Sequence, residues 1–189
     1  MADAGVPPEE VDASALVRVL GEVQRRGAIG RGPVEIAIAH ARQYITALPS
    51  EPGLLVDLGS GGGLPGVVIA AGAPRWRVVL IERREKRVDL LRYAVRSLGL
   101  ADRTEVIAGD AAAVAMRPGL HGQASVVTAR SFAPPLTVLS TAVPFLRSSG
   151  LVVISEPPDG AVRWSEDDLS RVGFVDDGTV GSLRRFRRH

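Results

Sequence analysis

The chain has 189 residues, of which 46% are hydrophobic, and a formal net charge of +2, so it can bury the core of one domain. It has no cysteine, which excludes disulfides and thiolate ligands, and its three histidines are scattered, so we expect no metal site. No apolar run reaches the ~20 residues of a membrane span, and the acidic start is unlike a signal peptide. We therefore expect a cytoplasmic protein that does not enter the membrane.

Two stretches near the amino end carry apolar residues at helical spacing. They predict helices over residues 9–26 and 34–48, preceded by a disordered lead over residues 1–8. These helices can lie over a ligand cleft or simply cover a sheet. We expect residues 1–52 to form a small N-terminal helical extension and residues 53–189 to form the main domain.

From residue 53 onward, short apolar strands alternate with helical segments. Such alternation is typical of an α/β, Rossmann-like fold, in which a parallel sheet with right-handed crossovers carries helices on both faces. Ligands in these folds bind at the carboxyl ends of the strands. We expect strands at 53–58, 77–82, 104–108, 125–129 and 151–155, and helices at 64–71, 84–98, 111–116 and 136–146. A short helix at 165–171 and two strands, 172–175 and 182–188 around Gly178, would follow.

Residues 57–66, Asp-Leu-Gly-Ser-Gly-Gly-Gly-Leu-Pro-Gly, predict a strand end, a tight glycine turn and a helix start, with Pro65 in the first helical turn. Glycine permits positive φ and close approach of a ligand, and a helix N-terminus favours a carboxylate or phosphate. The run from Gly61 formally matches the dinucleotide fingerprint. The acid at Asp57, however, would repel a pyrophosphate. An acid followed by alternate glycines resembles motif I of class I S-adenosylmethionine (SAM) methyltransferases, in which it can organise the loop and meet the methionine ammonium.

Three further polar residues follow predicted strands. Glu82 can accept hydrogen bonds from both ribose hydroxyls of a nucleoside, or it is an ordinary strand-end acid. Asp110 can frame an adenine, or cap the short helix that follows. Arg130 can hold the SAM carboxylate or a substrate phosphate through its planar fork, or it is a surface arginine. Glu156-Pro157-Pro158 predicts a turn.

Nearly all basic residues are arginines, and they cluster at residues 83–87 and 184–188. Arginine suits phosphate recognition, although the many alanines and glycines are equally consistent with a bias from a GC-rich genome. If the chain binds RNA, we expect Arg130 and the C-terminal arginines to meet phosphates.

Residues 57–66, together with Glu85-Lys86-Arg87 and Thr128-Ala129-Arg130-Ser131, resemble the RsmG (GidB) family, which methylates N7 of a guanine in 16S ribosomal RNA. The resemblance covers about residues 53–154. It implies a class I SAM-dependent methyltransferase fold, SAM as cofactor, and RNA, as 16S rRNA or the 30S subunit, as partner. It also implies that Gly59 and Leu64 contact SAM, that Ala111 and Ala112 lie by the adenine, and that Arg130 belongs to the active site as its candidate catalytic residue. The predicted cofactor-binding residues are Asp57, Gly59, Ser60, Gly61, Gly63, Leu64, Glu82, Asp110, Ala111, Ala112 and Arg130.

The sequence departs from this family outside the SAM motifs. The N-terminal Trp-Asn and Asn-Leu-Thr patterns are missing, and the His-x-x-Asp-Ser segment is echoed only in His40-Ala41-Arg42-Gln43-Tyr44. Ser155-Glu156-Pro157-Pro158 stands where the family tends to have Lys-Gly. These segments lie where RNA would be met. Two alternatives therefore stay open: a diverged methyltransferase acting on a small molecule, and a SAM- or RNA-binding module with little catalysis.

Overall fold

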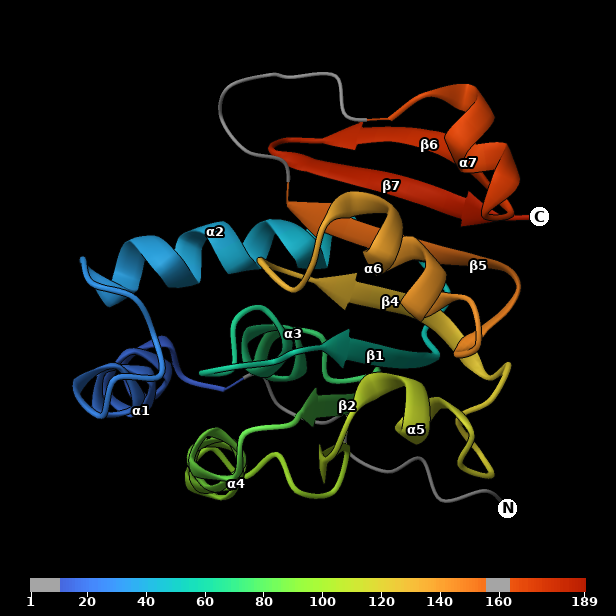
Figure 1. Cartoon of the computed structure of the whole chain (residues 1–189). Coiled ribbons are helices and arrows are strands. Elements are labelled where there is room, and N and C mark those ends of the chain that lie inside the picture. The colour runs from blue at the N-terminus through green and yellow to red at the C-terminus, as the bar shows by residue number, and fades with distance from the viewer. Residues whose placement is uncertain (1–10, 156–163) are drawn as a thin grey trace, which may run out of the picture.

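The computed structural model describes residues 11–155 and 164–189. Seven strands form one sheet in the order β3-β2-β1-β4-β5-β7-β6 (Figure 1). The first five in the chain are parallel, and β7 pairs antiparallel with both β5 and β6. The strands are β1 (Leu54–Leu58), β2 (Arg77–Glu82), β3 (Thr104–Ala108), β4 (Ala124–Ala129), β5 (Leu146–Ser155), β6 (Phe174–Val180) and β7 (Leu183–Arg188). The predicted α/β fold is confirmed.

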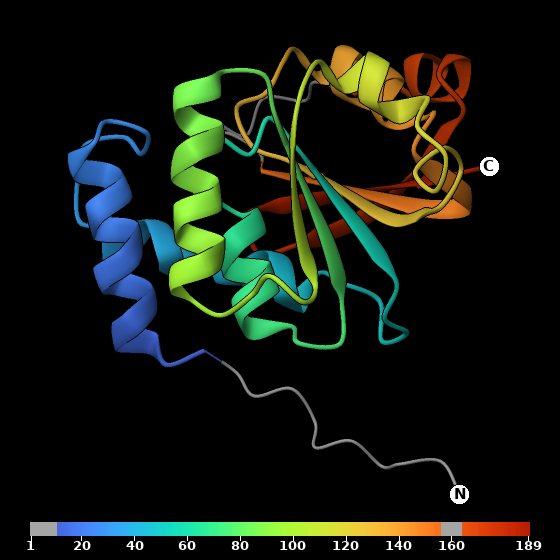
Figure 2. The same ribbon diagram turned by 90° about the horizontal axis from the view of Figure 1, so that it is seen from below.

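Helices cover both faces of this sheet, as the two views in Figures 1 and 2 show. One face carries α1 (Ala13–Arg25), α2 (Val34–Thr46), α3 (Gly66–Gly72) and α4 (Glu85–Ser97), and the other carries α5 (Ala111–Ala115), α6 (Pro135–Ala142) and α7 (Glu166–Arg171). Each layer buries its own hydrophobic cluster against the sheet. Strands β1, β2 and β4 are almost continuously buried, because a parallel sheet covered on both sides has no solvent-facing side.

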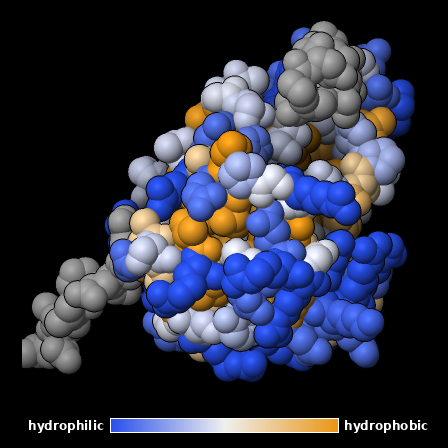
Figure 3. Space-filling view, turned by 90° about the vertical axis from the view of Figure 1, so that its left-hand side faces the viewer, coloured by the Kyte–Doolittle hydropathy of each residue, from blue (hydrophilic) through white to orange (hydrophobic). Residues whose placement is uncertain are grey.

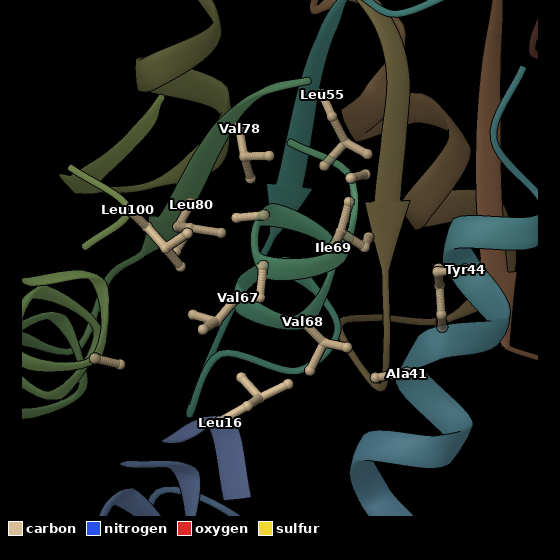
Figure 4. Packing of buried hydrophobic residues seen from close by; sticks show 14 of the residues in the cluster. Leu16, Ala41, Tyr44, Leu55, Val67, Val68, Ile69, Val78, Leu80 and Leu100 are labelled. Atoms are coloured by element: carbon tan, nitrogen blue, oxygen red, sulfur yellow. The ribbon is translucent and has the colours of Figure 1, made fainter. Parts of the chain in front are cut away.

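Helix α3 is buried over nearly its whole length, which explains why it is apolar on every side. Val67, Val68 and Ile69 point in different directions around it (Figure 4). Leu16 of α1 and Ala41 of α2 belong to the same cluster as α3. The two N-terminal helices therefore share one core with the sheet-covering helices α3 and α4.

Several predicted boundaries were wrong. The helix predicted over 136–146 ends at Ala142, because Pro144 has no N–H to continue it, and β5 begins at Leu146 rather than at residue 151. The turn predicted at Gly178 lies beyond Val180, while Gly178 sits inside β6, where the register with β7 shifts between Asp176 and Thr179. The first helix, predicted from residue 9, begins at Ala13, because Asp12 is its N-cap and accepts from the Ala15 N–H. The predictions for residues 1–8 and for the turn at residues 156–158 fall outside the described residues.

Among the described helices, none has the length and apolar character that a membrane crossing requires.

Candidate active site

A cavity of about 430 Å³ opens at the carboxyl ends of β1 to β4, within the usual size range of small-molecule sites. Of the predicted site residues, it is lined by Gly59, Glu82, Asp110, Ala111 and Ala112. Sequence reasoning missed the wall that the segment after β4 contributes, namely Ser131, Phe132, Ala133, Thr137 and Thr141. Phe132 contacts Gly59, since a Cβ on that glycine would come within 2.6 Å of the ring. Its first residue, Ser131, ends the motif Thr128-Ala129-Arg130-Ser131, and the aromatic ring of Phe132 is a further signal that could have indicated this wall.

The glycine turn serves two purposes. Gly61 has φ of +57°, and an added Cβ would make only ordinary van der Waals contacts, with Arg87 Nη1 and the Gly59 carbonyl oxygen at 3.7 Å. Glycine is therefore required there by its left-handed backbone. Gly62 has an ordinary backbone but is packed tightly, because a Cβ would come within 2.4 Å of Ile29 and 2.7 Å of the Ala28 carbonyl oxygen. The loop between α1 and α2 thus lies directly on the glycine turn.

Glu82 joins the glycine turn to the start of α4. Its Oε2 accepts a hydrogen bond from the Gly61 N–H at 3.1 Å, and its Oε1 accepts one from the Arg84 N–H at 2.9 Å. Arg87 Nη1 lies 3.9 Å from Oε2. A carboxylate can accept about four hydrogen bonds, so Glu82 retains acceptor capacity on the side that lines the cavity. The side chain is buried, which excludes the alternative of an ordinary exposed acid.

Asp57 lies beneath the turn with an exposure of only 1%. The Thr128 hydroxyl donates to its Oδ1 at 2.7 Å, and its Oδ2 lies against Gly66, where α3 begins. Burial raises the pKa of Asp57 to about 6, and the hydrogen bond from Thr128 opposes that rise. Ser60 is tied to the same place, because its hydroxyl donates to the Asp57 carbonyl oxygen at 3.0 Å. The geometry suits an acid that organises the loop from below.

Asp110 caps α5, as one of its two predicted roles required: its Oδ1 accepts from the Ala112 N–H at 2.9 Å. The side chain is exposed and also lines the cavity. The predicted role beside an adenine is therefore compatible with the cap.

Arg130 follows β4 and is partly exposed, outside the lining of the cavity itself. It stands beside His40 of α2, whose pKa is lowered first by burial and then by the charge of Arg130.

Gly63 and Leu64 also lie outside the cavity lining. An added Cβ on Gly63 would meet Val67 at 2.6 Å, and Leu64 packs on the core shared by α1 to α4. The peptide bond between Leu64 and Pro65 is cis, and Pro65 caps α3 instead of opening its first turn.

Each of the four C-terminal arginines has a partner within the protein, and their contact with phosphates stays a prediction. Three of them pair with acids of the β6–β7 hairpin, and the fourth donates to carbonyl groups between α6 and β5. Arg184 pairs with Asp176, Arg185 and Arg187 pair with Asp177, and Arg188 donates to the carbonyl oxygens of Val143 and Leu146.

Figure 3 faces the edge of the sheet to which β1, β2 and β4 point in Figure 1. Apolar surface runs through the middle of this face and is bordered by strongly hydrophilic side chains.

Within residues 11–155 and 164–189, no group of three or more His, Asp or Glu residues could hold a metal ion.

The strand order, the glycine turn after β1 and the acid at the end of β2 define a class I SAM-dependent methyltransferase fold. The chain belongs to the GidB family, rRNA small subunit methyltransferase G, whose model matches residues 38–157. It is 36% identical over 162 residues to "Ribosomal RNA small subunit methyltransferase G" of Rubrobacter xylanophilus, covering 82% of this chain and 62% of that protein. It is 34% identical over 186 residues to the protein of the same name from Kineococcus radiotolerans, covering 88% and 69%. A methyltransferase from Geobacter sulfurreducens has the same fold, with a TM-score of 0.62 and 22% identity over 98% of this chain and 92% of its own.

Proposed function

We propose that this protein transfers a methyl group from SAM to N7 of a guanine in 16S ribosomal RNA, as free RNA or in the 30S subunit. The observation that carries the proposal is the family match over residues 38–157, which contains the whole lining of the cavity from Gly59 to Thr141. The relatives from Rubrobacter xylanophilus and Kineococcus radiotolerans are named as methyltransferases of small-subunit ribosomal RNA. The choice of N7 follows from the motif resemblance.

The residues of the cavity fit SAM. Glu82 keeps acceptor capacity for ribose hydroxyls, and Asp110, Ala111 and Ala112 border a space for the adenine. Gly59, which belongs to the glycine turn and lines the cavity, supports a place for the methionine end along that turn. We therefore propose the cofactor site that the sequence predicted: Asp57, Gly59, Ser60, Gly61, Gly63, Leu64, Glu82, Asp110, Ala111, Ala112 and Arg130.

In this mechanism the protein binds SAM and the RNA and aligns guanine N7 with the methyl group. When bound, SAM supplies a methyl group already activated by its sulfonium. No general base is needed, since guanine N7 carries a free lone pair at neutral pH. The rate then depends on holding N7 in line with the methyl group and on keeping water away. Arg130, at the end of β4, is placed to hold a carboxylate or phosphate beside the reacting atoms.

The N-terminal part contributes to the same site. We propose that residues 1–52 act as a helical extension over the cofactor loop, supported by the packing of Ala28 and Ile29 on Gly62. An RNA substrate of the ribosome also implies that the protein works in the cytoplasm.

The proposal is tested by incubating the purified protein and SAM with 30S subunits and naked 16S RNA from a strain lacking the gene, followed by mass spectrometry of the nucleosides. We expect new 7-methylguanosine with the wild-type protein, at least ten-fold less with Arg130→Ala, and a wild-type yield with Arg147→Ala. Arg147 is a matched control, because it is an exposed arginine at the start of β5. Since β4 and β5 are parallel, it lies at the opposite end of the sheet from Arg130, which follows the end of β4. Methyl transfer to another acceptor but not to this RNA would overturn the proposal.

A further inference from the structure

Helix α2 reaches the carboxyl end of β4 through a buried tyrosine. The Tyr44 hydroxyl donates to the Ala129 carbonyl oxygen at 3.1 Å, and the tyrosine side chain is fully buried. Figure 4 shows Tyr44 projecting from α2 on the side of α3 and the sheet. Burial raises its pKa to about 12, and hydrogen bonding to Ser155 offsets part of that rise. The hydroxyl therefore remains a proton donor at any working pH and sits between the ends of β4 and β5.

The carbonyl that Tyr44 holds is the last one before the chain leaves the sheet. Ala129 is paired in register with Leu58 of β1 and Ile154 of β5. Arg130 follows at once, and Ser131 has φ of +51°, a left-handed conformation that is uncommon outside glycine. Arg130 is thus the single residue between the Ala129 carbonyl, which Tyr44 contacts, and the sharp turn at Ser131. The backbone on these two sides determines the direction in which its side chain leaves the strand.

Helix α2 is itself held in place at this edge. Gln43 Oε1 accepts hydrogen bonds from the Ser182 hydroxyl at 2.9 Å and from the Ser182 N–H at 3.3 Å. Ser182 lies in the turn between β6 and β7. The neighbouring residues Gln43 and Tyr44 thus tie α2 to the β6–β7 turn and to the end of β4.

We propose that Tyr44 is a positioning residue: by holding the Ala129 carbonyl, its hydroxyl fixes the direction in which Arg130 leaves β4 toward the acceptor. The effect that this inference predicts on methyl transfer rests on the proposed function. The effect that it predicts on the position of Arg130 does not. A substitution that removes the hydroxyl alone should impair methyl transfer through Arg130, and should leave SAM binding, which depends on the glycine turn and Glu82, unchanged.

The kinetic test compares Tyr44→Phe, Arg130→Ala and the double variant on the RNA substrate. We expect Tyr44→Phe to lower kcat at least five-fold with the Kd for SAM within two-fold of wild type, and the double variant to be no slower than Arg130→Ala alone. Tyr93→Phe is the matched control, because Tyr93 is the other tyrosine of the chain. It lies on α4, where its ring contacts Arg26 at the end of α1. Wild-type kcat for Tyr44→Phe, or effects that multiply in the double variant, would overturn the inference.

A second measurement does not depend on activity. The Nε–H resonance of Arg130, assigned by its loss in Arg130→Ala, should shift and broaden in Tyr44→Phe, while that of Arg103, whose Nε donates to the Ala70 carbonyl oxygen, stays in place. An unchanged Arg130 resonance would overturn the inference even if the protein methylates no RNA. A thermal melt establishes that the variant is folded. If it is not, Gln43→Ala removes the contact of α2 with Ser182 but keeps the Tyr44 hydroxyl on the Ala129 carbonyl. An unchanged Arg130 resonance is then expected, and a shift would overturn the inference.

Discussion

The Thr128 hydroxyl donates to the Asp57 carboxylate at 2.7 Å, so a side chain of β4 holds the acid of β1 that underlies the glycine turn. Thr128 and Asp57 are almost completely excluded from solvent, at 0% and 1% exposure. Because β1 and β4 are adjacent and in register at this pair, the contact links the cofactor loop to the strand that carries Arg130.

The first prediction concerns the pH dependence of stability. The folded-state pKa of Asp57, about 6, is above its ordinary value of 3.8. The stability associated with its protonated form is therefore fully present below pH 3.8 and is lost as the pH rises through 6. We expect denaturant unfolding to show that, between pH 3.8 and 6, the free energy of unfolding of the wild type falls by about 3 kcal/mol relative to that of Asp57→Asn. Above this interval the difference between the two proteins should stay constant.

Thr128→Val provides the matched control for this prediction. It keeps the shape of the side chain but removes the donor that favours the ionised acid, so the loss of stability should extend to higher pH. A difference between wild type and Asp57→Asn that stays constant from pH 4 to pH 7 would show that the carboxyl is not perturbed.

The second prediction separates backbone strain from ligand binding. Gly61→Val should abolish SAM binding in calorimetry, because a β-branched residue resists the left-handed backbone on which the loop depends. Gly99→Val carries the same strain, at φ of +64° with no neighbour within 4 Å of a Cβ, but lies after α4, outside the cavity. We expect both variants to lose stability and only Gly61→Val to lose binding. Retained affinity in Gly61→Val would contradict the loop assignment.

The third prediction concerns Glu82. Glu82→Gln keeps the size of the side chain but replaces one acceptor oxygen by a donor, so it cannot accept from Gly61, Arg84 and a ribose at once. We expect SAM affinity to fall at least ten-fold, which corresponds to about 1.4 kcal/mol. Glu105→Gln, an exposed acid on the adjacent strand β3, should bind SAM normally. Equal affinities for the two variants would remove Glu82 from the site.

The fourth prediction concerns the C-terminal hairpin. Asp177→Asn weakens the pairs with Arg185 and Arg187, so we expect it to destabilise the fold by about 1–2 kcal/mol in urea unfolding, since a charge is left unpaired in a partly buried place. RNA affinity should stay unchanged, because we expect the hairpin to lie outside the RNA-binding surface even when two of its arginines are released. Asp167→Asn, on the exposed surface of α7, controls for the loss of one acid. Tighter RNA binding by Asp177→Asn than by Asp167→Asn would show that the released arginines belong to the RNA-binding surface.

Much of the site could be predicted from local sequence. The strand endings at Leu58 and Glu82, the glycine turn between β1 and α3 and the cap at Asp110 all appeared where the pattern placed them. Each depends on residues a few positions apart, through strand periodicity, turn chemistry or capping. The end of the helix at Ala142 was missed because apolar residues continue past it into β5.

The sequence by itself determined the α/β order of elements and the cofactor loop, because hydrophobic spacing and glycine conformation act over short distances along the chain. Only the tertiary structure decided what lies around that loop. Ala28 rests on Gly62, and Tyr44 holds a carbonyl 85 residues further along the chain. Arg184, Arg185 and Arg187 pair with acids of their own hairpin. These contacts join surfaces that meet only when the sheet forms, so no local pattern in the sequence records them.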